Sequence, residues 1–223
     1  ALDAGSGVTP YLVDPSQEVI TPAVFEDYEP QVSVMPRISF SFPISDEALF
    51  FAHYDVLTQR PMSRVQLDIT DFYFIESKTS DANFPFNNPN LKPTRTVDYE
   101  LGFQQKLSNT SSLNLSAFYR DMKDQIQVYR FSGAYPRSYY SYNNIDFGTV
   151  KGITVTYDIR RTNNARIRAS YTLKFANRTG TNDETAKNLV TSGQPNLRTV
   201  NPLDYDRRHA INLVLDYRFA SGK

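Results

Sequence analysis

The sequence contains no cysteine, no tryptophan and only two histidines among its 223 residues. Without cysteine there is no disulfide framework, and metal sites that use thiolate ligands are excluded. Lysine plus arginine and aspartate plus glutamate number 24 each, so the formal net charge is zero. A chain without a basic excess lacks the electrostatic footprint of a nucleic-acid-binding protein. We therefore expect no nucleic acid among its partners.

Long apolar runs are also missing. No stretch approaches the ~18 consecutive apolar residues that a membrane-spanning helix requires. The N-terminal residues lack the basic and apolar regions of a signal peptide. What the chain has instead is tyrosine and phenylalanine, 15 of each, among many serine, threonine and asparagine residues. This composition favours β-strands.

The clearest pattern lies between Asn88 and Asp124, where polar and apolar residues alternate on both sides of a short turn at residues 108–111. A period of two puts all the apolar side chains of a strand on one face. The apolar members are Val97, Tyr99, Leu101 and Phe103 before the turn, and Leu113, Leu115, Ala117 and Tyr119 after it. The stretch therefore predicts a hairpin with one apolar and one polar face.

The same alternation recurs along the chain and predicts seven strands, over residues 32–42, 48–59, 95–107, 112–129, 145–160, 165–176 and 207–219. The connections alternate in length. They are short at 43–47, 108–111 and 161–164, and long at 60–94, 131–142 and 177–206. Residues 1–30 show no period and are predicted to be an extracellular loop segment, followed by a partial β-barrel domain over residues 31–223.

These lengths favour an all-β fold, an antiparallel up-and-down segment of a transmembrane β-barrel. The predicted strands are longer than those of most soluble sheets, and all the long loops fall at one end, as in outer-membrane barrels. A closed bacterial barrel has an even number of strands, and open edges are not tolerated in lipid. Seven strands therefore predict a piece of a larger barrel. The alternative is a soluble β-sandwich that binds glycans through its tyrosine-rich loops.

Two motifs resemble those of TonB-dependent outer-membrane receptors, particularly the Bacteroidetes type. They are Asn88-Pro89-Asn90-Leu91-Lys92-Pro93 and, just after it, Tyr99-Glu100-Leu101-Gly102-Phe103. Further similar segments are Pro36-Arg37-Ile38-Ser39-Phe40-Ser41, Gln59-Arg60-Pro61 and Tyr205-Asp206-Arg207-Arg208-His209. The resemblance covers roughly residues 31–220. It does not extend to a plug domain, a TonB-box segment or a terminal strand, and Thr94 stands where the family commonly has glutamate.

The resemblance implies a parent protein of the bacterial outer membrane that imports a nutrient, such as a siderophore, a glycan or a peptide. It implies outer-membrane lipid around the barrel, TonB acting through a plug domain outside this chain, and a surface lipoprotein as a further partner. It does not identify the nutrient.

Aromatic residues in two predicted loops are the candidate ligand contacts, because aromatic faces stack on sugars and apolar ligands while hydroxyl and guanidinium groups supply hydrogen bonds. The candidates are Tyr135, Arg137, Tyr139, Tyr140 and Tyr142 in one loop, and Phe72 and Tyr73 in the other. Two other roles stay open for these residues: an aromatic girdle at the membrane interface, or packing of the loops against each other.

Catalytic patterns are weak. His53 and His209 lie on different predicted strands and have no metal-ligand spacing, while Asp98 and Glu100 are ordinary residues for a polar lumen. Nucleotide-binding and nucleophile motifs are missing. A barrel enzyme would need a nucleophile and a histidine on adjacent strand faces, and no such spacing is visible. We expect no enzyme activity, no cofactor and no metal site.

Overall fold

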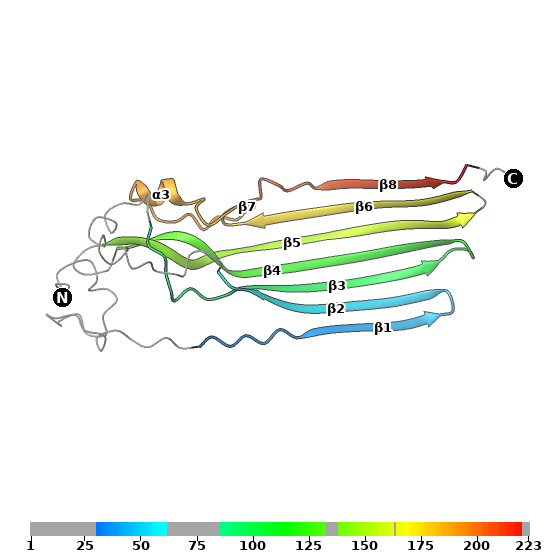
Figure 1. Cartoon of the computed structure of the whole chain (residues 1–223), viewed down its shortest axis with the longest axis horizontal. Helices are drawn as coiled ribbons and strands as arrows, with labels where there is room; N and C mark the ends of the chain where they lie inside the picture. The colour runs from blue at the N-terminus through cyan, green and yellow to red at the C-terminus, as the bar shows by residue number, and fades with distance from the viewer. Residues whose placement is uncertain (1–29, 62–84, 133–137, 163, 220–223) are drawn as a thin grey trace.

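One antiparallel sheet runs through the computed structural model, which describes residues 30–61, 85–132, 138–162 and 164–219 (Figure 1). The elements in chain order are β1 (Arg37–Ser45), β2 (Ala48–Gln59), β3 (Thr94–Lys106), β4 (Ser111–Phe131), β5 (Tyr139–Thr162), β6 (Ala165–Arg178), α3 (Lys187–Thr191), β7 (Asn201–Pro202) and β8 (His209–Tyr217). The strands follow one another in the sheet from β1 to β7, and β8 also pairs with β6. The predicted all-β, antiparallel, up-and-down arrangement is confirmed.

The strand bounds follow the prediction most closely at β2 and β3. The strand predicted at 48–59 is β2, and the one predicted at 95–107 is β3. At the first edge, β1 begins only at Arg37, and residues 30–36 belong to no element. At the other edge, β7 and β8 pair with opposite ends of β6. The eight strands therefore occupy seven positions in the sheet.

The predicted loop at residues 131–142 is wrong. Strand β4 continues to Phe131 and β5 begins at Tyr139, so Tyr139, Tyr140 and Tyr142 lie in a strand. Alternation marks a strand only where one face is polar, and here buried residues occur on both faces, as with Gln127 and Val128. The predicted loop at 177–206 likewise contains α3, a five-residue helix without a side-chain cap. Its N-cap position is Ala186, which is not a preferred capping residue and does not mark the start of the helix.

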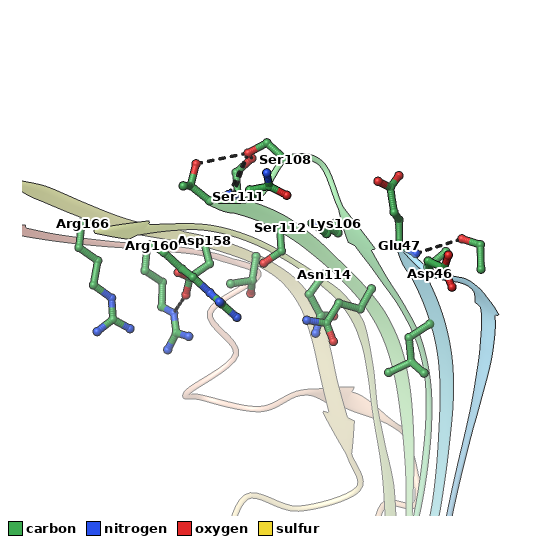
Figure 2. Close-up of a pocket in the computed structure, with 18 of the residues that line it drawn as sticks. Asp46, Glu47, Lys106, Ser108, Ser111, Ser112, Asn114, Asp158, Arg160 and Arg166 are labelled. Atoms are coloured by element: carbon green, nitrogen blue, oxygen red, sulfur yellow. Dashed lines mark hydrogen bonds and ion pairs between the residues drawn. The ribbon is translucent and has the colours of Figure 1, made fainter. Parts of the chain in front are cut away.

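The sheet sorts its side chains by polarity, because the pairing registers align apolar residues across the strands. One row joins Phe42, Phe50, Phe103, Leu115, Val155, Tyr171 and Ile211. Many of these apolar side chains are exposed, including Leu115 at 46% and Ile211 at 81%. The sheet is curved, and polar residues such as Asn114, Asp158 and Arg160 lie on its inner side (Figure 2). The apolar rows therefore cover the convex face.

Two glycines on the concave face are required by aromatic neighbours. Phe51 pairs with Gly102 and Phe118 pairs with Gly152. In each pair the phenyl ring lies where a side chain on the glycine would be; a Cβ on Gly152 would stand 2.7 Å from Cζ of Phe118. Aromatic rings that cover cross-strand glycines support both residues of the pair. Each aromatic ring thus lies over the glycine on the neighbouring strand and adds apolar surface to the concave face without a steric clash.

We call the part of the sheet in which the successive strands pair side by side the wall. Beyond it, β4 and β5 continue as what we call the loop-end extension: residues 124–131 and 139–147. It begins at a bulge, where the register shifts between Met122 and Ile126 and Asp124 adopts a φ of 55°. A bulge bends the strand and increases its twist. The Asn144 amide donates to the carbonyl oxygen of Asp124 at 2.7 Å and holds the bulge in place.

The loop-end extension carries a hydrophobic cluster of its own. Its buried members are Leu91, Val128, Tyr142, Ala186 and Val190, with Ile126 and Tyr140 packed beside them. These residues come from three segments far apart in the sequence: the approach to β3, the β4–β5 pair and α3 with its preceding turn. In Figure 1, α3 lies at the same end of the sheet as the extension. The cluster thus joins the long connections to one end of the sheet.

Candidate functional site

The turn end of the concave face forms an open hollow of about 1020 Å³ (Figure 2). Its lining mixes both charges: Asp46, Glu47, Lys106, Asp158, Arg160, Arg166, Arg168 and Asp216. Arg168 donates to the Asp158 carboxylate at 2.6 Å. Because cations and anions are balanced here, the hollow offers a hydrated polar surface rather than a site selective for one sign of charge.

Nearer the middle of the wall, the concave face holds a second hollow of about 460 Å³. Arg120 binds Asp98 through two hydrogen bonds of 2.6 and 2.7 Å, and Arg37 lies 4.0 Å from Asp55. His53 shares a hydrogen bond of 3.0 Å with Ser39. The charges of the inner face therefore pair mainly with one another across strands, which is how a polar lumen accommodates them.

The loop-end extension presents aromatic residues on both of its faces. On one face, Tyr129 meets Phe131 edge-on at 5.0 Å and Phe131 stacks on Tyr139 at 4.8 Å. On the other face, the guanidinium of Arg130 lies 5.8 Å from the ring centroid of Tyr140, and its Nη2 donates to Ser138. Tyr129 and Phe131 are half-buried and Tyr139 is buried. Aromatic rings that keep part of their surface accessible can contact a flat apolar part of a ligand.

The predicted ligand residues separate in the structure. Tyr139 joins the stack with Phe131, whereas Tyr142 is only 1% exposed and belongs to the hydrophobic cluster, with Tyr140 beside it. The packing role left open by the sequence therefore applies to Tyr142. The other candidates, Tyr135, Arg137, Phe72 and Tyr73, lie outside the described residues, and their role stays a prediction.

Three residues at this end escaped the sequence analysis as ligand candidates: Tyr129, Arg130 and Phe131. The sequence offered a signal, because the aromatic-Arg-aromatic run stands just before the tyrosine-rich stretch. The run was not assigned to a ligand site because residues 112–129 already fitted a transmembrane strand. The alternation of polar and apolar residues continues beyond the level of the membrane and does not show where the membrane ends.

Within the described ranges, no group of three or more histidine, aspartate or glutamate side chains has an arrangement able to hold a metal ion. No helix in those ranges is long and apolar enough to cross a membrane. His209 shares a hydrogen bond of 2.8 Å with the hydroxyl of Tyr171. Both histidines thus have polar partners on the sheet itself.

The segregation of faces and the position of the long connections agree with a comparison of the sequence with known families. The family described as TonB dependent receptor-like, beta-barrel matches residues 19–223. The chain belongs to this family. Its members form barrels in the bacterial outer membrane, so the convex face of this TonB-dependent receptor-like barrel is the lipid-facing side. The family consists of receptors and transporters rather than enzymes.

Solved structures support the same fold. The pyoverdine outer membrane receptor FpvA of Pseudomonas aeruginosa, bound to pyoverdine, is similar with a TM-score of 0.54 at 14% identity, over 84% of this chain and 22% of that chain. The outer membrane transporter YddB of Escherichia coli gives 0.52 at 13% identity, over 83% of this chain and 26% of that chain. A comparison with curated proteins finds no match.

At such identities the likeness shows the fold alone. This TonB-dependent receptor-like chain spans about a quarter of the length of the solved structures that it resembles. A soluble sandwich is not favoured, because the family is a membrane barrel and no second sheet packs on the apolar face within the described ranges.

Proposed function

We propose that this chain is a segment of the barrel wall of a TonB-dependent receptor, of the Bacteroidetes type, that imports a small nutrient across the outer membrane. The nutrient is a siderophore, a glycan or a peptide. The proposal includes TonB acting through a plug domain outside this chain and a surface lipoprotein as an extracellular partner. The family assignment supports the transport class, and FpvA, which shares the fold, is a receptor solved with pyoverdine.

The observation that carries the ligand site is the stack of Tyr129, Phe131 and Tyr139 in the loop-end extension. It lies at the end of the sheet that carries the long connections, where a ligand arriving from outside would first meet the barrel. Phe131 and Tyr129 are half-buried, so the surrounding structure fixes their rings while part of each remains accessible. Preformed aromatic surface of this kind binds with little loss of side-chain freedom.

The test uses the full-length receptor and isothermal titration calorimetry with three probes: a ferric siderophore, a linear oligosaccharide and a short peptide. One class is expected to bind, and Phe131→Ala is expected to weaken it by about tenfold or more, as loss of an aromatic anchor does. Tyr157→Ala, on the convex face near the turns, is the matched control and should bind as the unchanged receptor does. Equal binding by the Phe131 variant would remove the extension from the ligand site.

A further inference from the structure

The segments that flank the loop-end extension have exchanged edges relative to the wall. In the wall, β4 has β3 as its outer neighbour and β5 has β6. In the extension, a residue that precedes β3 lies on the edge of β5, because the Phe86 amide donates to the Tyr140 carbonyl oxygen at 2.9 Å. A residue that follows β6 lies on the edge of β4, because the Val128 amide donates to the Asp183 carbonyl oxygen at 2.9 Å. Both connections therefore pass from one strand to the other at the base of the extension.

The connection before β3 makes this crossing within residues 88–93, the first motif that the sequence marked. Arg95, just after the motif, still pairs with β4. At the start of the motif, the Asn88 side-chain nitrogen donates to the Tyr142 carbonyl oxygen of β5 at 2.9 Å. The Asn88 side-chain oxygen accepts from the amide of Asn90 at 2.9 Å, which fixes a turn in the chain. The motif thus moves from the edge of β4 to the edge of β5 within a few residues.

One side chain, that of Asn144 on β5, joins the crossing segment to the bulge of β4. Its oxygen accepts from the Lys92 amide at 2.8 Å, and its nitrogen donates to the Lys92 carbonyl oxygen at 2.9 Å. The same nitrogen donates to the carbonyl oxygen of Asp124 at 2.7 Å. An asparagine amide has two N–H donors, one for each of these carbonyl groups. Asn144 therefore connects β4, β5 and the approach to β3 at a single point.

The bulge depends on such support because Asp124 has a φ of 55°. Residues other than glycine are uncommon in this left-handed region, although aspartate enters it more readily than most. A conformation of this kind persists where the surrounding structure holds it. The pairing register of β4 with β5 also shifts here, between Met122 and Ile126. The bulge is therefore the point at which the direction of the extension is set.

We infer that Asn144 is a positioning residue for the ligand site: together with residues 88–93, it fixes the direction in which the loop-end extension leaves the wall. The ligand part of this inference rests on the proposed function, since the stack of Tyr129, Phe131 and Tyr139 lies beyond the bulge. Asn144 acts through backbone groups rather than on the ligand. If the extension loses its direction, only a fraction of the molecules presents the stack correctly, and the apparent affinity falls by that fraction.

The test measures the direction of the extension in the full-length receptor, by double electron–electron resonance between spin labels at Arg95→Cys and Ser132→Cys. The first label reports on the wall and the second on the tip of the extension, roughly 30 Å further along β4. Asn144→Ala removes three hydrogen bonds and is expected to shift or broaden the distance distribution. Asn143→Ala is the matched control, because its side chain bonds the next backbone amide, and it should leave the distribution unchanged.

A second pair of variants tests the bulge itself. Asp124→Gly should keep the distance distribution, because glycine adopts a positive φ readily. Asp124→Val should change it as Asn144→Ala does, because a β-branched residue is an outlier at positive φ. Heat-dependent gel mobility shows whether each variant is a folded barrel. An unchanged distribution in folded Asn144→Ala, an equal change in Asn143→Ala, or equal behaviour of the two Asp124 variants would overturn the inference.

A ligand measurement separates this inference from the proposed function. In the calorimetric titration with the class of probe that binds, Asn144→Ala should weaken binding by about threefold, the loss expected if a third of the molecules present the stack correctly. Asp124→Gly should bind as the unchanged receptor does. Full affinity in Asn144→Ala despite an altered distance distribution would remove the positioning role. Full affinity in Phe131→Ala would instead overturn the proposed function, and the distance measurement would still decide how the extension is held.

Discussion

The wall of the sheet and the loop-end extension use the same two strands, β4 and β5, in different ways. In the wall, apolar side chains cover the convex face and stay exposed, as Leu115 does. In the extension, beyond the bulge at Asp124, apolar side chains are buried against other segments of the chain, as Val128 and Tyr142 are. The apolar side chains of the wall face membrane lipid, whereas those of the extension form a small protein core.

The two regions also differ in how their backbone polar groups find hydrogen-bond partners. In the wall, the inner strands β2 to β6 pair with neighbours on both sides, so their peptide groups are satisfied inside the sheet, as a lipid environment demands. In the extension, the neighbouring strands have ended, and side chains and loops supply the missing partners. The Val128 amide donates to the carbonyl oxygen of Asp183, and the Phe86 amide donates to that of Tyr140. Loops are thereby fixed to the barrel by hydrogen bonds rather than by a longer sheet.

The largest expected effect concerns the convex face of the wall. Leu115→Arg should destabilise the receptor folded in a bilayer by about 2–4 kcal/mol if this position is near mid-membrane, because a charge would face hydrocarbon. Urea titrations of full-length receptor folding into vesicles measure it. Asn114→Arg, the adjacent position on the polar face of β4, is the control and should cost much less. Equal costs at both positions would mean that neither face meets lipid.

An intermediate effect is expected in the extension. Gln127 is 1% exposed; its amide donates to Asp146 and to the Asn182 carbonyl, and its oxygen accepts from the Ala186 amide. Gln127→Ala leaves buried groups unpaired and should cost about 1–3 kcal/mol. Hydrogen exchange should rise at residues 182–190 and remain unchanged in the wall strands. Gln125→Ala, whose side chain lies outside this network, is the control, and a uniform rise in exchange would contradict a local role.

The smallest effect is expected on the concave face of the wall. The Arg120 and Asp98 side chains are 49% and 26% exposed, and water screens their attraction. Asp98→Asn should therefore change folding stability by about 1 kcal/mol or less, despite the short contact. The same urea titration measures it, and Asp158→Asn in the Arg168 pair provides a second example. A loss of several kcal/mol would show that the concave face is dry, in contrast to the open hollows seen here.

Much of the wall could be predicted because a strand with one apolar and one polar face leaves a period of two in the sequence. Residues 48–59 and 95–107 have almost the bounds of β2 and β3 for this reason. The candidate site was predictable only in part. The sequence indicated tyrosines near residue 139, yet it could not separate Tyr139, which stacks on Phe131, from Tyr142, which is buried in the cluster.

The sequence by itself determined the all-β class, the alternation of faces and the placement of long connections at one end, since each depends on neighbouring residues along the chain. The tertiary structure decided which residues meet across segments. Leu91, Tyr142 and Val190 form one cluster because three segments converge after the strands end, and no local period encodes that.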